Sequence, residues 1–412
     1  MTSLGGRLGG RGRRGAPIGR RRWLGKSFLL GHRPDGLDGT RRLIAVTPIG
    51  EQGGAEAVLV RLLAAAVAAG WEVQCCCPRG EVAQQLRDAG VRVRRIPPAL
   101  AGTGTLRFVV LGLRLLGVAA VVAASGRADV VLSNGLTTLL PLRLLRTVGL
   151  LTPPTVVAWL AHDVVVHRNR QQYLRAGAPA LDVAAVVSNA VAGPLRAQGI
   201  KCVLLRNGAP WPLEPAAPAD WPPWVIGCNA ALTEWKGQRV LLDAVAGMRE
   251  RRVVVELLGR TFGGDRAYRA ALEARAGESD LAGRVHFLGW SSEPLMVMRR
   301  WHVAVSASTS PEASALGVLE AMALGVPQVC TAHGGPSEIL GEAGLLVAPG
   351  DPMTMAAALD ALLADPVLWA RCHTAGRRVV AAGMTVDAQD RGFVALLEAW
   401  RDGNLEPAGQ AS

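Results

Sequence analysis

The chain has 412 residues, of which half are apolar and 19% are charged. This composition is typical of a globular protein with two or three domains and not of a membrane protein. The net charge is +12, but residues 1–42 hold eleven Lys or Arg against two Asp and so carry +9 of it. We expect no nucleic-acid partner, because that reading rests on charge alone and no nucleic-acid-binding motif accompanies this local excess.

Residues 1–40 are expected to form a basic, disordered tail. Attraction to an anionic membrane surface is the second interpretation of its charges. Its apolar stretch "WLGKSFLLG" is too short for a signal peptide and contains Lys26. The tail is either a real appendage or an overextended start of the chain. The sequence therefore predicts a cytoplasmic protein and leaves open a peripheral contact with the inner face of the membrane.

The most apolar window covers residues 108–124 and is interrupted by Arg114. It is shorter than the roughly 20 residues that a spanning helix needs. We therefore expect a buried or surface-lying helix at this position.

Seven cysteines are present, and three of them, Cys75, Cys76 and Cys77, are consecutive on an expected strand. Neighbouring side chains of a strand point to opposite faces, so these three cannot share one metal ion. No other cysteine spacing fits a zinc site. The sequence predicts small buried thiols in a reducing compartment, and no metal site.

After the tail, short apolar runs alternate with helical stretches up to residue 206. Such alternation predicts parallel strands with helices on both faces of the sheet. Helices are expected over residues 54–69, 81–90 and 105–124. Strands are expected at "RLIAVTP", "WEVQCCC", "VRVRRIP", "ADVVLSN", "PTVVAWLAH", "AAVVSNA" and "KCVLLRNG".

Residues 207–223 contain six prolines and are expected to form a stiff linker between two domains. The alternation then restarts over residues 224–385. A C-terminal helix is expected over 386–402 and a disordered tail over 403–412. Strands of the second domain are expected at "WVIGCNA", "RRVVVELLG", "RVHFLG", "HVAVSAS" and "VPQVC", and helices are expected to start near Gln238, Ala267, Ala313, Met353 and Asp387.

The predicted fold class is thus α/β, with two doubly wound Rossmann-like domains that face each other across a cleft. In open parallel sheets, ligands bind at the carboxyl ends of the strands. The first strand leads into the loop "PIGEQGGAE", whose Gly53 and Gly54 either let the backbone approach a ligand or merely permit a tight turn.

The stretch "SASTSPEASALGVLEAMALGVPQVCTAHGGPSEIL", residues 306–340, is the most informative of the chain. Glu312 lies in the loop after an expected strand, and Glu320 lies two turns into the following helix. The N-terminus of that helix carries unpaired backbone N–H groups and a partial positive charge, which suit a phosphate. The two carboxylates could then accept hydrogen bonds from hydroxyl groups on either side of a bound diphosphate.

This stretch resembles the signature of family 4 of the retaining glycosyltransferases, which have the GT-B fold. "PEASALGVLEAMALGVP" and "GGPSE" are similar to that family's Pro-Glu-x-Phe-Gly, Glu-Ala-Met-Ala-x-Gly-x-Pro and Gly-Gly-x-x-Glu patterns. The segments "WKGQRVLLDAV", "GRVHFLGW" and "AGLLVAPGDPMTMAAAL" extend the resemblance over nearly the whole chain after the tail. Together these segments are specific, whereas each alone is only moderately so.

The resemblance implies roles for individual residues. Glu312 would bind the transferred sugar, Glu320 the nucleotide ribose, and Lys236 the diphosphate. His162 would lie near the donor sugar. The donor phosphates would contact a further group of residues, namely Gly53, Gly54, Leu316, Gly317 and Val318.

Two positions depart from the family pattern. Its Phe-Gly pair is replaced by Ser314 and Ala315, which are still small. The usual phosphate-binding Arg, five residues before Lys236, is replaced by Ala231. Arg260, which follows a neighbouring expected strand, is the candidate substitute.

The function that the resemblance implies is transfer of a sugar from a nucleotide-diphosphate sugar to an acceptor hydroxyl, with retention of anomeric configuration. The acceptor would be a sugar or a lipid-linked molecule in glycan, glycolipid or polysaccharide synthesis. We expect no cofactor besides the donor substrate. The open alternatives are a sugar-nucleotide epimerase of related fold and a donor-binding protein with weakened catalysis, the latter suggested by Ala231.

Overall fold

The computed structural model describes residues 40–97, 106–218 and 222–406. The expected basic tail therefore lies outside the described residues, and so do residues 407–412. Residues 403–406, which the sequence assigns to a disordered tail, form a turn whose Leu405 packs against the first hydrophobic core.

The first sheet has seven parallel strands in the order β3-β2-β1-β4-β5-β6-β7. The order reverses between β1 and β4, and this reversal is the topological switch point at which doubly wound sheets bind ligands. The strands are β1 Arg42–Val46, β2 Glu72–Cys77, β3 Arg92–Arg95, β4 Val130–Ser133, β5 Val156–Ala161, β6 Val183–Val186 and β7 Cys202–Leu204.

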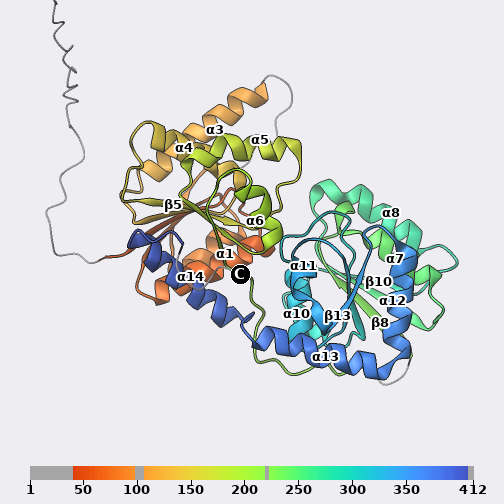
Figure 1. Cartoon of the computed structure of the whole chain (residues 1–412). Helices are drawn as coiled ribbons and strands as arrows, with labels where there is room; N and C mark the ends of the chain where they lie inside the picture. The colour runs from red at the N-terminus through yellow and green to blue at the C-terminus, as the bar shows by residue number, and fades with distance from the viewer. Residues whose placement is uncertain (1–39, 98–105, 219–221, 407–412) are drawn as a thin grey trace, which may run out of the picture. The chain divides into compact units, whose positions relative to one another are not determined.

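Helices cover both faces of the first sheet (Figure 1) because alternate side chains of its strands are apolar on both sides. On β1, Leu43 belongs to the core under α1 and α2, and Ile44 belongs to the core under α3 and α4. The helices of this half are α1 Gly54–Ala68, α2 Glu81–Asp88, α3 Leu106–Ala123, α4 Leu139–Thr147, α5 Arg168–Gly177 and α6 Asn189–Arg196.

The consecutive cysteines follow the same alternation. Cys75 and Cys77 lie in the core under α1 and α2, whereas Cys76 lies in the core on the opposite face. The expectation that they are separate buried thiols is confirmed, since all seven cysteines are free and these three are buried.

The second sheet has six parallel strands in the order β10-β9-β8-β11-β12-β13, with its switch point between β8 and β11. The strands are β8 Trp224–Asn229, β9 Val253–Leu258, β10 Val285–Gly289, β11 Val303–Ser306, β12 Gln328–Thr331 and β13 Gly344–Val347. The helices are α7 Gln238–Gly247, α8 Arg266–Ala276, α9 Pro294–Met298, α10 Leu316–Leu324, α11 Gly334–Ile339, α12 Pro352–Ala364, α13 Pro366–Ala381 and α14 Val386–Arg401.

Local sequence explains where the last long helices begin. Each of α12 and α13 starts with an Asp-Pro pair, in which the proline occupies the first helical position. Asp351 accepts hydrogen bonds from the N–H groups of Met353 and Thr354, and Asp365 caps α13 in the same manner. The Asp365-Pro366 pair lies at the 98° bend between the two helices.

The start of α10 differs from the expectation. The sequence predicts a helix from about Ala313, but α10 begins at Leu316. Ala315 has a φ of 42°, so it lies in the left-handed region and cannot continue a right-handed helix. Residues 313–315 therefore belong to the loop that carries Glu312.

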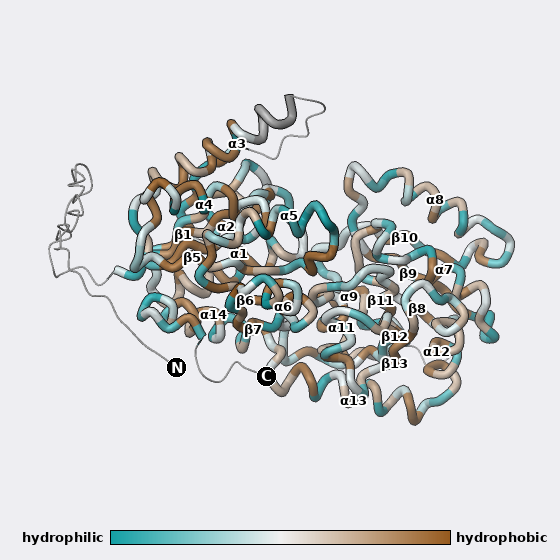
Figure 2. The backbone as a smooth tube through the Cα atoms, turned by 45° about the horizontal axis from the view of Figure 1, so that its top comes forward, coloured by the Kyte–Doolittle hydropathy of each residue, from teal (hydrophilic) through white to brown (hydrophobic). Residues whose placement is uncertain are grey.

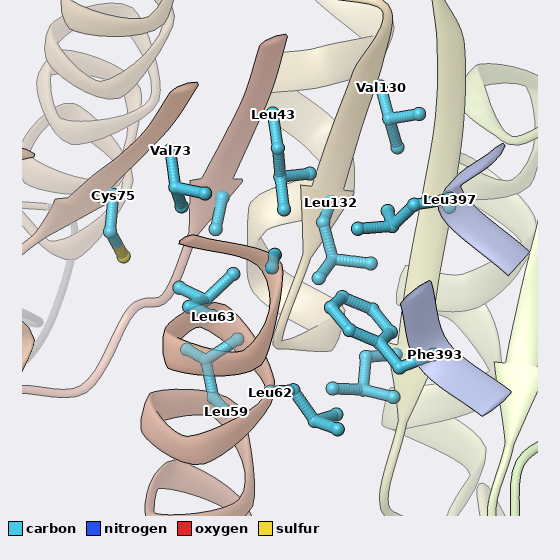
Figure 3. Close-up of a cluster of buried hydrophobic side chains, with 14 of the residues drawn as sticks. Leu43, Leu59, Leu62, Leu63, Val73, Cys75, Val130, Leu132, Phe393 and Leu397 are labelled. Atoms are coloured by element: carbon cyan, nitrogen blue, oxygen red, sulfur yellow. The ribbon is translucent and has the colours of Figure 1, made fainter. Parts of the chain in front are cut away.

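Helix α14 returns from the end of the chain to the first sheet. Phe393 and Leu397 pack beside Leu59 and Leu62 of α1 and against Leu132 of β4 (Figure 3). The core of the first half is therefore completed by residues that lie more than 300 positions after α1 in the chain.

Among the described residues, no single helix is both long enough and apolar enough to cross a membrane. Only α12 and α13 taken together, with the bend between them, reach that length and apolar character.

Candidate active site

A cavity of about 810 Å³ is lined by loops that leave the carboxyl ends of strands in both halves. These loops follow β1 and β5 in the first sheet, and β8, β9 and β11 in the second. The cavity thus lies at both switch points, as the fold predicts. All ten residues predicted for the site line it: Gly53, Gly54, His162, Lys236, Arg260, Glu312, Leu316, Gly317, Val318 and Glu320.

Glu312 and Lys236 form an ion pair inside this cavity. Glu312 is 4% exposed and follows β11, whereas Lys236 precedes α7. Burial lowers the pKa of Lys236 to about 8, because the low-dielectric surroundings disfavour the ammonium. The pair is therefore a cation and an anion that lie together at the floor of the cavity, available to a polar ligand.

Glycines allow the backbone to pack closely around this pair. Gly334 has a φ of 71°, and a Cβ there would lie 2.2 Å from the carbonyl oxygen of Glu312. Gly237 has a φ of 69°, and a Cβ there would lie 2.0 Å from the carbonyl oxygen of Ala307. The Gly-Gly and Lys-Gly motifs of the sequence are thus needed to hold the loops of Glu312 and Lys236.

Helix α10 presents its N-terminus to the cavity. Gly317 allows close packing there, since a Cβ would lie 2.7 Å from the carbonyl oxygen of Asn229. Glu320, one turn further, accepts a hydrogen bond of 2.9 Å from Nδ2 of Asn229. Burial raises the pKa of Glu320. Asn229 is a site residue that sequence reasoning missed, because it lies 91 positions before its partner.

The glycine loop after β1 meets α10 from the opposite half. A Cβ on Gly54 would lie 3.3 Å from Cδ1 of Leu316, so only a small residue fits without a shift. Gly53 is the N-cap of α1, and Glu56 three residues later forms hydrogen bonds with backbone groups of Gly53 and of its own residue. This is the Glu half of a capping box, because glycine at the N-cap has no side chain to reciprocate, and burial raises the pKa of Glu56.

His162 follows β5 and lines the cavity. Burial lowers the pKa of its imidazole to about 4, so the ring is neutral near pH 7. Its Nε2 has no hydrogen-bond partner among the described residues. A buried ring nitrogen without a partner is available to a ligand hydroxyl group.

Arg260 and Ala231 both line the cavity, on loops that follow the paired strands β9 and β8. The guanidinium of Arg260 lies 5.2 Å from the ring centre of Trp290 and 3.5 Å from Oε2 of Glu81. Arg260 is therefore a cation at the cavity, on the loop next to the one where the family's arginine is missing.

Two exposed tryptophans at this cavity were not singled out by the sequence analysis. Trp290 is 57% exposed, and Trp235 is 43% exposed. The ammonium of Lys236 lies 4.3 Å from the ring centre of Trp235. Within the described residues, no group of three or more His, Cys, Asp or Glu could hold a metal ion.

Models of two known families match the chain. "Glycosyl transferase 4-like domain" matches residues 53–208, and "Glycosyl transferases group 1" matches residues 223–365. The two matches cover the strands whose loops line the cavity, except β1, which ends before the first matched residue.

Curated relatives are similar over part of their length. The lipopolysaccharide core biosynthesis glycosyltransferase LpsE of Rhizobium meliloti is 32% identical over 182 residues, which cover 44% of this chain and 51% of that protein. The D-inositol 3-phosphate glycosyltransferase of Corynebacterium urealyticum is 34% identical over 148 residues, 34% of this chain and 35% of that protein. The chain thus matches about half of these relatives' length or less.

Solved structures share the fold over most of both chains. Anabaena HepE, in complex with UDP and glucose, aligns with a TM-score of 0.75 at 21% identity, over 87% of this chain and 99% of that one. Sucrose-phosphate synthase from Thermosynechococcus elongatus aligns with a TM-score of 0.75 at 21% identity, over 88% and 100%. The expected GT-B fold is confirmed, and these matches do not favour the epimerase or the weakened binding protein.

Proposed function

The chain belongs to the group 1 glycosyltransferases with the GT-B fold, and on that premise we propose that it is a retaining enzyme of family 4. It transfers a sugar from a nucleotide-diphosphate sugar to an acceptor hydroxyl in glycan, glycolipid or polysaccharide synthesis. The observation that carries this proposal is the buried Lys236–Glu312 pair beside the N-terminus of α10, in one cavity with Glu320.

The donor diphosphate is bound by the cations and dipoles of the second half. The N-terminus of α10 supplies N–H groups and a partial positive charge. Lys236 supplies an ammonium that Glu312 keeps in place when no donor is bound. Both groups lie where negative charge develops as the diphosphate leaves, and such preorganised charge lowers the barrier.

The sugar and the ribose are bound by the two carboxylates. Glu312 accepts hydrogen bonds from sugar hydroxyl groups and stabilises the positive charge that develops at the anomeric carbon. Glu320 accepts hydrogen bonds from the ribose hydroxyl groups. Its carboxylate is held in place by the hydrogen bond from Asn229. The neutral imidazole of His162 supplies Nε2 to the sugar from the opposite half.

The reaction follows from these placements. The bond between the anomeric carbon and the phosphate oxygen breaks, and the acceptor oxygen bonds to that carbon from the same face. The proton of the acceptor hydroxyl passes to the departing phosphate oxygen. No side chain forms a covalent intermediate in this scheme, which is the course that the family resemblance implies.

A donor containing UDP is the first choice for a test, because HepE was solved with UDP-glucose. The purified chain is incubated with UDP-glucose, UDP-N-acetylglucosamine and GDP-mannose, and release of the nucleoside diphosphate is measured with and without EDTA. We expect turnover of at least one donor that EDTA does not abolish. Proton NMR of the product gives the anomeric configuration.

Two results would contradict the proposal. An inverted anomeric configuration would remove the retaining mechanism. Activity that EDTA abolishes and magnesium restores would show that Lys236 and the helix N-terminus do not suffice for the leaving diphosphate.

A further inference from the structure

The two halves of the chain carry opposite net charges. Residues 43–206 contain 17 Lys or Arg against 8 Asp or Glu, a net charge of +9. Residues 207–412 contain 17 Lys or Arg against 23 Asp or Glu, a net charge of −6. Outside the tail, positive and negative charges nearly cancel over the chain as a whole, but the first half is basic. An anionic surface would attract this half.

Helix α3 of this basic half exposes an apolar face. Leu113 is 65% exposed and Leu116 is 57% exposed. Ala120 and Ala123 are also exposed, and the spacing of these four residues places them on one side of the helix. We call them the α3 stripe. Figure 2 shows the hydrophobic colouring of α3 at the outside of the first half.

The α3 stripe is distinct from the buried face of the same helix. Val118, Ala119 and Val122 pack into the core with Leu142 of α4. The helix is therefore apolar on both faces, although only one is covered by described residues. Single exposed leucines are ordinary, but an exposed face of a helix with apolar residues only indicates a contact with another apolar phase.

Helix α5, which packs against α4 as α3 does, carries basic side chains. Helix α5 contains no acidic residue, and it exposes Arg168 and Arg175, neither of which has an ion-pair partner among the described residues. Helices α3 and α5 both pack against α4, and Figures 1 and 2 show the three on the same face of the first sheet. Arg114 of α3 lies within electrostatic range of Tyr173 of α5.

Arg114 follows Leu113 directly and is only partly exposed at the border of the stripe. Its Nε is buried and has no hydrogen-bond partner in the part of the chain that the structure describes. An apolar helix face with arginines at its border is the pattern of a helix that lies in the interface of a bilayer. In such a helix the arginines reach the headgroup phosphates, while the apolar side chains enter the acyl boundary.

We propose that the α3 stripe, together with Arg168 and Arg175 of α5, docks the protein on the surface of an anionic lipid bilayer. The two signals are both required, because apolar contact or charge alone gives only weak and reversible membrane binding. This inference goes beyond the proposed function, since it depends on neither the donor nor the reaction. It places the surface on the folded first half and not on the N-terminal tail.

The test is sedimentation of the full-length protein with vesicles of phosphatidylcholine, alone or mixed in equal parts with phosphatidylglycerol. We expect binding to the mixed vesicles, and a loss of about tenfold or more in the double variant Leu113→Ser/Leu116→Ser, which removes two exposed leucines that would enter the acyl boundary. The variant Arg168→Gln/Arg175→Gln should lose about fivefold for each arginine on the mixed vesicles only.

The matched control changes apolar residues that are at least as exposed but lie in the second half. Met353 is 81% exposed and Val367 is 78% exposed. The variant Met353→Ser/Val367→Ser should bind the mixed vesicles like the unchanged protein. Urea denaturation of each variant verifies folding, and the arginine pair remains informative if the leucine pair lowers stability.

Two outcomes would overturn the proposal. If both pairs bind vesicles like the unchanged protein and high salt removes the binding, then the basic tail or another charged segment is responsible. If the unchanged protein is a dimer by sedimentation velocity, and the leucine pair makes it a monomer without affecting vesicle binding, then the α3 stripe is covered by a second copy.

Discussion

Ala315 is the one non-glycine residue with positive φ among the described residues, and it stands where the family pattern has glycine. A left-handed conformation costs an alanine on the order of 1–2 kcal/mol, whereas glycine adopts it freely. We therefore expect Ala315→Gly to stabilise the protein by about 0.5–1 kcal/mol, after the larger entropy of glycine in the unfolded chain is offset. The urea midpoint measures this change.

The control for this prediction is the same substitution in a regular helix. Ala267 is exposed on α8. Ala267→Gly should lower the free energy of unfolding by about 0.5–1 kcal/mol. Loss of stability in both variants would show that the positive φ of Ala315 carries no strain.

The two glutamates of the cavity should differ in what they bind. If Glu312 contacts the sugar and Glu320 the ribose, Glu312→Gln should lower kcat by tenfold to a hundredfold and leave the Kd of UDP nearly unchanged. Glu320→Gln should instead raise that Kd about tenfold. UDP contains the ribose and lacks the sugar, so calorimetric titration of UDP separates the roles. An equal loss of UDP affinity in both variants would contradict the assignment.

His162 should make stability depend on pH. Its pKa is about 4 in the folded protein and about 6.5 when unfolded, so between these values only the unfolded chain binds the proton. Stability should therefore fall as pH decreases from 6.5 to 4, by roughly 3 kcal/mol from this group. The free energy of unfolding, measured by urea titration at pH 7 and at pH 4.5, should therefore fall less between the two pH values in His162→Gln than in the unchanged protein.

The comparison for His162 uses an exposed histidine. His286 lies exposed on β10, and His286→Gln should keep the pH dependence of the unchanged protein. If His162→Gln keeps it as well, the imidazole is protonated in the folded state and does not act as a neutral group.

How much of the site the sequence predicts depends on the kind of contact. Glu312 and Lys236 could be found because each belongs to a motif of a few residues. The partner of Glu320 could not, because Asn229 reaches it only through the pairing of β8 with β11. The left-handed φ of Ala315 was equally hidden, since alanine seldom adopts it.

At the scale of elements, strands were predicted where apolar residues are dense. The edge strand β13, Gly344–Val347, is not among the expected strands; it has only four residues, and three of them are partly or well exposed. The helices that the sequence did not predict are α4, α5, α6, α9, α11 and α13. Helix α4 packs against its chain neighbours α3 and α5 and has only nine residues, whereas α13 packs mainly against α10, which lies well before it in the chain.

The neighbouring strands β8 and β9 place Ala231 and Arg260 on adjacent loops, joined by a hydrogen bond of 3.0 Å from the N–H of Leu232 to the carbonyl of Arg260. If Arg260 substitutes for the family arginine, Arg260→Ala should lower kcat/KM for the donor by tenfold to a hundredfold. Ala231→Arg should leave kcat/KM for the donor unchanged or lower it, because Arg260 already occupies the position of the family arginine.

The opposite pattern would show that the cavity lacks a cation. In that case Ala231→Arg would raise donor turnover several-fold, and Arg260→Ala would be harmless. Glu81→Gln serves as the control, since Glu81 contacts Arg260 but is 54% exposed. Its removal should change kcat/KM far less than Arg260→Ala does.

At the scale of the whole molecule, the first half is not built from its own stretch of chain alone. Helix α14 supplies Phe393, Leu396, Leu397 and Trp400, all fully buried, to the core between α1 and the first sheet. Arg61 of α1 also binds α14 through an ion pair with Asp390. The ends of the described chain are thereby held against one core, so the two halves are coupled through α14 as well as through the linker.

The substitution Phe393→Ala tests this coupling. It leaves a cavity under α1, and the loss of a buried phenylalanine costs about 3–5 kcal/mol. We expect the urea midpoint to fall accordingly. Arg391→Ala, at an exposed position of the same helix, should shift the free energy of unfolding by less than about 0.5 kcal/mol. If Phe393→Ala costs as little as Arg391→Ala, α14 is not needed for the first half, and residues 40–208 should then fold when expressed by themselves.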